Sequence, residues 1–346
     1  MPVTIDGSAG GGQVLRSALS LAAVTGEAVR VEDVRGARPN PGLKHQHLAC
    51  VEAAAAVCDA DVDGAELGSD VVAFDPGDPT GGSVAVDVGT AGAATLVFET
   101  VLPLGVVVDD PIELTVTGGT DVAWSPTVDY YRDVRLPLAA RAGWRATVDV
   151  SRRGFYPGGG GEATLRVAPS ERERVAFDDR GAFRGARVEA VASSDLADAD
   201  VADRLVAAAV DDLETANVEV DMSTARSVRA PSTGAGVLVV LDYEATTAGF
   251  SALGEPGTPA EDVGERAAAD AVAFRGQERS SPDAGGPRRP PVVDVHAADQ
   301  LVLALALASG RVRPAAVTEH VRANCAVARA FGFDVRVDDD GVIVGE

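Results

Sequence analysis

Three segments of this 346-residue chain share one pattern, in which an apolar strand ends near an aspartate and passes through a turn of small residues into an apolar helix. The segments begin at Val3, Val84 and Val292 and read VTIDGSAGGGQVLRSALSLA, VAVDVGTAGAATLVFETVLPL and VVDVHAADQLVLALALA. Each is followed by a second helical stretch and a strand pair. Ala/Val-rich helices can resemble one another by chance, but here the order of elements repeats as well. The pattern predicts three β-α-β-α-β-β units.

A different pattern occupies residues 181–276, with strands such as RVEAVASS and GVLVVLDYEA and helices such as ADVADRLVAAAVDDLE. Residues 277–291 are rich in Pro, Gly, Ser and Arg, which is typical of an exposed linker. We therefore expect an α/β (α+β) protein. Its core domain, 1–180 and 277–346, holds the three units around a pseudo-threefold axis, and a smaller α/β insert domain at 181–276 lies between units two and three.

The chain carries 53 acidic against 30 basic residues, a formal net charge of −23, and Lys44 is its only lysine. A surface this acidic stays soluble by self-repulsion, which salt screens, so we expect a salt-adapted protein that is more stable in high salt. The same charge disfavours nonspecific binding of nucleic acid, because phosphate contacts need local cations.

The expected compartment is the cytoplasm. Apolar runs such as 301–308 are far shorter than the ~18–20 residues that span a bilayer, so no membrane partner is expected. The N-terminal residues show no basic region before an apolar stretch, and hence no signal peptide. Cys50, Cys58 and Cys325 lack C-x-x-C spacing, which argues against a disulfide framework or a zinc cage.

Two neighbouring stretches are candidates for binding an anion. The turn at residues 7–12 (GSAGGG) joins a strand to a helix, where glycines let backbone N–H groups approach a phosphate; tight packing explains such a turn equally well. The stretch 34–47 (VRGARPNPGLKHQH) concentrates cations. Arg35 and Arg38 suit a phosphorylated ligand, and the alternative is a solvated basic face paired with carboxylates.

Two of the four histidines, His296 and His320, lie in the third unit. If three units pack around one axis, their turns and helix starts converge, which brings His320 close to Arg35, Arg38 and Asp299. A neutral imidazole there could attack phosphorus or act as a general acid or base, although a structural surface histidine is an open alternative. The chain has no G-x-S-x-G elbow, Ser-His-Asp signature or metal-ligand spacing of His and Cys.

The hairpin RGFYPGGGGEATL, which begins at Arg153, has four consecutive glycines. Such a run requires either positive φ angles or a close backbone contact, unless the hairpin is simply flexible.

Taken together, the sequence resembles the RNA 3'-terminal phosphate cyclases. The matching stretches run in family order from about residue 5 to residue 333 and read IDGSAGGGQVLRSALSL, VRGARPNPGLKHQHL, GAELGS, GGTDVAWSPTVDYYRDVRLPL, RRGFYPGGGGEA, ADQLVLALALA and TEHVRANCAVARAFG. The resemblance implies three units of two helices on a four-stranded sheet, with an α/β insert between the second and third.

The resemblance also implies a ligase-class activity that uses ATP. A histidine attacks the α-phosphorus of ATP, giving covalent His–AMP and pyrophosphate. AMP then passes to the 3'-terminal phosphate of an RNA, and the neighbouring 2'-hydroxyl displaces it to form a 2',3'-cyclic phosphate. A divalent cation, Mg²⁺ or Mn²⁺, would neutralise charge at phosphorus.

Each implied role falls on matching positions of this chain. His320 resembles the adenylated histidine, in a helix that also holds Asn324. The positions that resemble the ATP/AMP-binding residues are Glu99, His296, Ala297, Ala298, Asp299 and Gln300. Those that match positions near the nucleotide and the RNA phosphate are Arg16, Arg35, Arg38 and Gln46.

Several positions depart from the family pattern. Ala9 precedes the three glycines, where the family usually has a metal-binding Glu, so the metal ligands stay unassigned. Glu99 replaces a usual Gln, and His296 a common Tyr. The sequence leaves the physiological RNA and the oligomeric state open.

Two other functions compete with the catalytic one. A non-catalytic, cyclase-like RNA-binding or ribosome-assembly protein would lack the nucleophile, and His320 is present. An enolpyruvyl transferase on a related fold would lack the RGFYPGGGG hairpin and would need more lysine.

Overall fold

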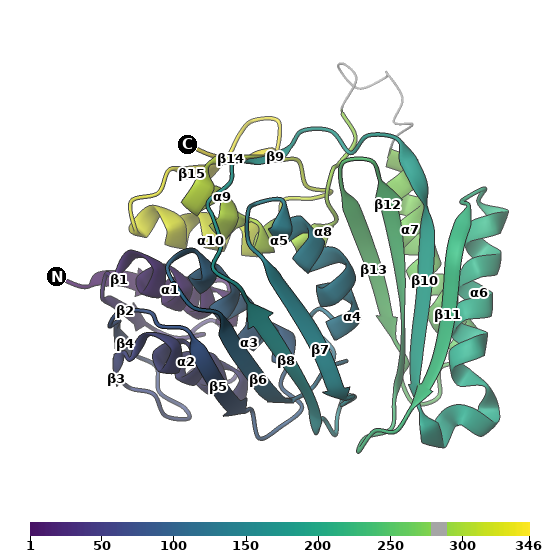
Figure 1. Cartoon of the computed structure of the whole chain (residues 1–346), viewed down its shortest axis with the longest axis horizontal. Helices are drawn as coiled ribbons and strands as arrows, with labels where there is room; N and C mark the ends of the chain where they lie inside the picture. Colours follow the sequence, from purple (N-terminus) through teal and green to yellow (C-terminus); the bar gives the residue numbers. More distant parts are fainter. Residues whose placement is uncertain (278–288) are drawn as a thin grey trace.

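The strands of the computed structural model, which describes residues 1–277 and 289–346, form four four-stranded sheets (Figure 1). Three sheets share one strand order, in which the first strand pairs in parallel with the second, and the fourth lies antiparallel between the second and the third. This confirms a mixed α/β architecture, whereas the pseudo-threefold axis stays a prediction. The part of the predicted linker from 278 to 288 lies outside the described residues.

The first sheet has the order β1-β2-β4-β3 and carries two long helices. Helix α1 is buried at almost every position, as expected for a helix at the centre of a core, and it ends at Gly26, whose φ of +72° lets its N–H reach the Ala22 carbonyl. The elements are β1 Val3–Asp6, α1 Gly12–Thr25, β2 Val29–Glu32, α2 His45–Cys58, β3 Asp61–Asp63 and β4 Val72–Asp75.

The second sheet has the order β5-β6-β8-β7. Strand β6 alternates buried and half-buried residues along its length, which is the pattern of a strand with one face on the core. A π-helical turn, η2, divides its second helix. The elements are β5 Gly82–Asp87, α3 Ala94–Val101, η1 Leu102–Val106, β6 Ile112–Gly118, α4 Val128–Tyr130, η2 Tyr131–Arg135, α5 Leu136–Ala140, β7 Ala146–Arg152 and β8 Gly161–Val167.

The third sheet corrects one prediction. Its first strand is Val175–Phe177, which pairs in parallel with Gly310–Val312, whereas the predicted strand at Val292 makes only an isolated bridge from Val293 to Pro314. The insert therefore leaves the third unit after its first strand, rather than between units two and three. The elements are β9 Val175–Phe177, α8 Val295–Gln300, α9 Val302–Ala308, β14 Gly310–Val312, α10 Glu319–Ala330, β15 Val335–Val337 and β16 Ile343–Gly345.

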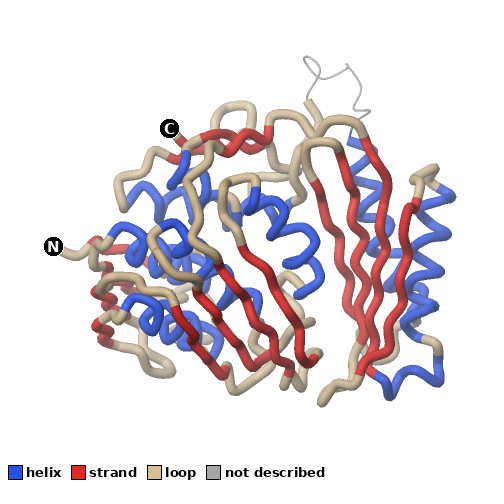
Figure 2. Tube along the Cα trace, viewed as in Figure 1, coloured by secondary structure: helices blue, strands red, loops and turns tan. Residues whose placement is uncertain are grey.

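The insert has its own sheet, of order β11-β10-β12-β13, with α6 and α7 packed on one face (Figures 1 and 2). Its last strand, β13, was not predicted from the sequence; it follows β12 through a short turn and pairs with it along its full length. The elements are β10 Phe183–Ser193, η3 Ser194–Ala199, α6 Val201–Thr215, β11 Val220–Val228, β12 Ala235–Tyr243, β13 Thr247–Leu253 and α7 Ala260–Gly276.

Helices of the first three sheets gather between those sheets, as Figure 2 shows. Helix α1 packs against α2, α3 and α10, so all three units contribute to one hydrophobic cluster. A second cluster belongs to the insert and extends from Ala186 to Phe274. The domain boundaries at 181 and 276 stay a prediction. No helix in the described parts of the chain is both long and apolar enough to cross a bilayer.

The RGFYPGGGG hairpin is a packed contact between the two clusters. The backbone N–H of Phe155 donates to Ser232 Oγ (2.7 Å), which in turn donates to the Gly159 carbonyl (2.9 Å). Gly159 has a φ of +65°, and a Cβ there would lie 2.7 Å from Ala91 Cα. The glycines are therefore required by backbone conformation and close approach, not by flexibility.

Candidate functional site

A cavity of about 860 Å³ opens where the three units and the insert meet. Its wall comes from the start of α1, the loop after β2, the start of α2, the loop before α4, the end of β13, α7, α8 and α10. The predicted residues that line it are Arg16, Arg35, Arg38, Gln46, His296, Asp299, Gln300 and His320. Residues up to 304 positions apart in the sequence thus share one wall, although their chemical roles stay predictions.

Glycines at the start of α1 let three neighbours approach. Gly10 and Gly11 have φ angles of +73° and +61°. A Cβ at Gly10 would lie 2.8 Å from Ala323 Cβ of α10, and one at Gly12 would lie 2.2 Å from His47 Nε2. At Gly11 it would lie 3.0 Å from the Arg38 guanidinium. Tight packing therefore explains the glycines directly, and it leaves the N-terminus of α1 without a side-chain cap, facing the site.

His320 lies in the first turn of α10, whose N-cap Thr318 accepts a hydrogen bond from the Val321 N–H. The imidazole is exposed and lines the cavity. Partial burial, followed by the positive charges of Arg16 and Arg38, lowers the pKa of His320 below its ordinary value. The ring is therefore neutral at neutral pH and has a lone pair available for attack.

Asn324 lies one helical turn after His320 and fixes the position of α10. It is fully buried, accepts a hydrogen bond from Ser17 Oγ of α1 (2.7 Å) and donates from Nδ2 to the Asp299 carbonyl (2.8 Å). One amide thereby joins helices of the first and third units. The sequence placed Asn324 beside His320 but gave no sign of these partners.

Four arginines line the cavity, Arg266 of α7 among them, and the three that were predicted differ in what they bind. Arg16 is buried and donates to Gln13 Oε1, and burial lowers the pKa of its guanidinium. Arg35 donates to the carbonyl oxygens of Asn40 (2.7 Å) and Gly42 (2.9 Å), which closes its own loop. Arg38 is exposed: its backbone N–H donates to the Arg35 carbonyl (2.9 Å), and its guanidinium makes no hydrogen bond or ion pair with any described residue.

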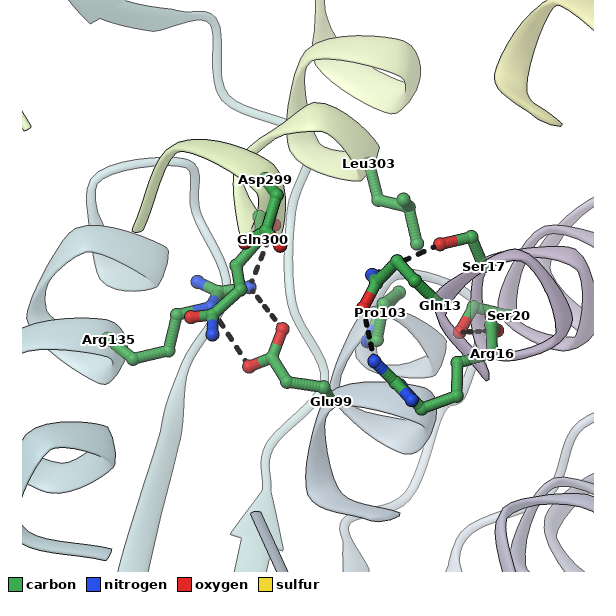
Figure 3. A pocket seen from close by; sticks show the side chains of 10 residues that line it. All are labelled: Gln13, Arg16, Ser17, Ser20, Glu99, Pro103, Arg135, Asp299, Gln300 and Leu303. Carbon is green, nitrogen blue, oxygen red and sulfur yellow. Dashed lines mark hydrogen bonds and ion pairs between the residues drawn. The ribbon is translucent and has the colours of Figure 1, made fainter. Parts of the chain in front are cut away.

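A small hollow of about 20 Å³ shares four lining residues with the cavity: Gln13, Arg16, Asp299 and Gln300 (Figure 3). Glu99 lies in this hollow but not in the cavity wall, and its carboxylate is paired with Arg135, Nε to Oε1 at 2.9 Å. Burial raises the pKa of Asp299 to about 7; the Arg16 charge opposes this shift and Glu99 adds to it. Asp299 therefore changes charge near neutral pH.

Helix α8 shows one face to the cavity and the other to the core. Asp294 caps it by accepting from the N–H groups of His296 and Ala297, both at 2.9 Å, and from the Tyr130 hydroxyl at 2.8 Å. The His296 ring lies edge-on to Tyr130, with centroids 6.3 Å apart. Ala297 and Ala298, which lie between His296 and Asp299 on this helix, are fully buried and do not line the cavity, so their role in binding the nucleotide stays a prediction.

Histidine His47 has a structural role. Its Nδ1 accepts from the Lys44 N–H (3.1 Å), so Nε2 carries the proton of the neutral ring. Burial, followed by the charges of Arg16, Arg35 and Lys44, lowers the pKa of His47 to about 3. The ring thus stays neutral while it caps α2 and packs on Gly12.

A protein-built site for the Mg²⁺ or Mn²⁺ that the resemblance implies does not fit the described residues. Asp129, Asp133 and Glu189 have oxygens within 4.8 Å of one another. Their negative charge is already matched by arginines. Arg132 forms ion pairs with all three carboxylates, Arg153 pairs with Asp129, and Arg226 pairs with Asp129 and Glu189. The cavity itself brings only separate carboxylates, Glu255 and Asp299, to its wall. The cation stays a prediction without ligands.

The sequence did not single out two residues that contact predicted site residues: Gln13, which accepts a hydrogen bond from Arg16, and Arg135, which pairs with Glu99. Trp124 also lines the cavity. The only signal for Trp124 was its rarity, because the chain has just two tryptophans. Gln13 and Arg16 lie three positions apart on α1, so helical spacing could have indicated their contact. No local signal could have identified the contact between Glu99 and Arg135, because it joins segments 36 positions apart.

Comparison with known proteins supplies a family. Residues 8–337 match the family model described as RNA 3'-terminal phosphate cyclase. Proteins named RNA 3'-terminal phosphate cyclase are 44% identical in Halobacterium salinarum (98% of each chain), 38% in Archaeoglobus fulgidus (99% of each) and 36% in Pyrococcus furiosus (95% of this chain, 93% of the relative).

Proposed function

The chain belongs to the RNA 3'-terminal phosphate cyclase family, which is a family of ligase-type enzymes, and on that premise we propose that it uses ATP to convert the 3'-terminal phosphate of an RNA into a 2',3'-cyclic phosphate. The observation that carries the proposal is the cavity in which a neutral His320 faces Arg16 and Arg38. A nucleophilic imidazole beside cations without carboxylate partners suits attack on a phosphoryl group. A non-catalytic RNA-binding or ribosome-assembly protein would have no use for a neutral histidine beside these arginines.

In the first step, the lone pair of the His320 imidazole attacks the α-phosphorus of ATP, a P–N bond forms, and pyrophosphate leaves with the electrons of the broken P–O bond. Arg16 and Arg38 stabilise the charge that develops on the phosphoryl oxygens. The uncapped N-terminus of α1 adds backbone N–H donors to the same wall.

In the second step, an oxygen of the RNA 3'-phosphate attacks the phosphorus of His320–AMP, which frees the imidazole and gives an RNA–adenylate. The adjacent 2'-hydroxyl then attacks the 3'-phosphorus, loses its proton and displaces AMP. Asp299, with a pKa of about 7, is a group near the site that can accept a proton at neutral pH. We place these reactions in the cytoplasm, since Cys50, Cys58 and Cys325 are free thiols, which suits a reducing compartment.

Incubation with ATP labelled in the α-phosphate tests the proposal. We expect covalent label that is lost in acid, as for a phosphoramidate, and discharged by RNA ending in a 3'-phosphate but not by RNA ending in a 3'-hydroxyl. His320→Ala should remove the label, a loss of at least about 1,000-fold. His45→Ala is the matched control, because His45 is an exposed histidine outside the cavity wall.

The pH dependence adds a second reading. Because the pKa of His320 is lowered, labelling should persist to lower pH than a histidine with its ordinary pKa would allow, and it should fail where the ring becomes protonated. Full labelling of the His320→Ala protein, or no cyclic product from 3'-phosphorylated RNA, would contradict the proposal.

A further inference from the structure

Trp124 lines the cavity and yet is 89% exposed, so it stands at the open mouth. The chain's other tryptophan, Trp144, is fully buried, as is usual for so large an apolar side chain. An indole that remains in water has given up the free energy of burial, about 25 cal/mol for each Å² of apolar surface. Trp124 belongs to neither hydrophobic cluster, so packing of the core does not explain its position at the mouth.

The backbone of Trp124 adds an independent observation. Its φ of +63° lies in the left-handed region, which is costly for a bulky side chain without a hydrogen-bonding group near the backbone. Arg35, in the facing loop, has a φ of +58° and also lines the cavity. Strained residues cluster where a ligand site over-determines the backbone, and two of them share this wall.

Tyr156 extends the aromatic surface away from the cavity. Its ring is 51% exposed and meets Trp124 edge-to-face, with centroids 5.7 Å apart and planes at 84°. The hairpin that carries it is anchored at Phe155, whose N–H binds Ser232 of the insert. The two rings therefore form a supported aromatic ledge, Trp124 and Tyr156, at the rim.

We propose that this ledge is a stacking platform for the bases immediately upstream of the RNA's 3'-terminal phosphate, an inference that rests on the proposed function. His320 and Arg38 line the same cavity, so the reacting phosphate sits inside while the rest of the polymer has to leave through the mouth. ATP, by contrast, is small enough to be enclosed: about 860 Å³ is near the upper end of pockets for small ligands.

Charge favours stacking as the means of recognition. The protein's net charge of −23 repels a polyanion wherever the strand extends beyond the arginines of the cavity wall. Stacking on an aromatic face depends little on charge and accepts any base, since every base has a π-face. Such a platform would let an acidic protein hold RNA ends of varied sequence.

The test uses the full chain with two changes at one position. Trp124→Asn removes the ring with a residue that tolerates positive φ, and Trp124→Phe restores an aromatic face. We expect the KM for a 3'-phosphorylated RNA to rise about 5- to 100-fold in Trp124→Asn and to recover largely in Trp124→Phe. Met222→Ala, an exposed apolar residue on β11 outside the cavity wall, is the matched control.

Labelling with ATP in the absence of RNA separates the two substrates. Under the proposal, the KM for ATP in this half-reaction stays within about twofold of the unaltered protein. A rise in the KM for ATP instead would assign the ring to the nucleotide and overturn the proposal, as would an unchanged KM for RNA.

Fluorescence keeps the test separate from the proposed activity. Because Trp144 is buried, emission that responds to RNA reports on Trp124, and we expect 3'-phosphorylated RNA to quench it. Quenching without any cyclic product would contradict the proposed function while supporting the platform. Cyclisation without quenching would overturn the platform alone.

Discussion

Two groups of arginines in this molecule have opposite surroundings. Arg153 and Arg132, between the second unit and the insert, bind carboxylates: Arg153 contacts Asp121 (3.0 Å) and Asp129 (2.7 Å), and Arg132 reaches Glu189 (3.0 Å). Among the arginines of the cavity wall, Arg16 donates to an amide, Arg35 donates to two carbonyl oxygens, and the guanidinium of Arg38 has no partner among the described residues.

The pKa values follow this difference. Burial by itself would lower the pKa of Arg153, but the charges of Asp121 and Asp129 raise it above its ordinary value. Burial lowers the pKa of Arg16, and the more distant Asp299 and Glu99 do not reverse it. In a chain with 53 acidic residues, arginines left without a carboxylate partner are the informative ones. Under the proposed function, their charge is available to the phosphate groups of the substrates.

The largest expected effect is on stability and tests the paired group. Arg153→Ala leaves Asp121 buried without its cation, while Asp129 keeps Arg132, and this should lower the free energy of unfolding by about 3–5 kcal/mol. Urea denaturation followed by circular dichroism measures this. Arg166→Ala is the control, since Arg166 pairs with Glu113 at the surface, and its midpoint should stay nearly unchanged. Equal midpoints for the two variants would show that the network is not structural.

The next effect tests the cavity group. Arg38→Ala should reduce kcat/KM for cyclisation about 10- to 100-fold through lost charge-assisted hydrogen bonds, with an unchanged urea midpoint. Arg35→Ala should lower both activity and stability, because Arg35 also ties its loop through Asn40 and Gly42. Kinetics and denaturation on the same preparations check both. If Arg38→Ala unfolded the chain without a kinetic defect, the distinction between the groups would fail.

The smallest expected effect concerns Asp299, whose pKa is raised by burial and by Glu99 but lowered by the charge of Arg16. Its folded pKa of about 7 exceeds the ordinary 3.8, so ionisation costs stability as pH rises from about 4 to 7, and the full cost remains above 7. Asp299→Asn should therefore stabilise the protein by about 1–3 kcal/mol at pH 8 and have little effect at pH 4. Thermal melts at the two pH values measure it. A loss of stability at pH 8 would mean that Arg16 depends on this carboxylate.

Local patterns were sufficient for much of the fold. The turn at Gly10–Gly12, the helix that His45 begins and the helix that holds His320 lie where the sequence placed them. The predicted strand at Val292 was wrong, because apolar alternation cannot show that β9, before the insert, takes the sheet position instead. Strand pairing over such a distance depends on the whole chain, as does the docking of the RGFYPGGGG hairpin on Ser232.

The candidate site was likewise predictable only in part from the sequence. Motifs identified the family, now confirmed, and pointed to His320, Arg38 and Asp299; the structure then placed these on one wall. It did not place Ala297 and Ala298 there, because a helix turns adjacent residues toward different sides. It paired Glu99 with Arg135, a partner that no spacing in the sequence indicates.

The sequence by itself determined the family, the candidate nucleophile and the excess of acidic charge, because residue identity and short-range order decide these. Only the tertiary structure decided which arginines are neutralised, how far each pKa moves and that Trp124 stands at the cavity mouth. Those properties depend on burial and on contacts between distant segments, as between Arg132 and Glu189, and the energy of a charge is set by what surrounds it in space.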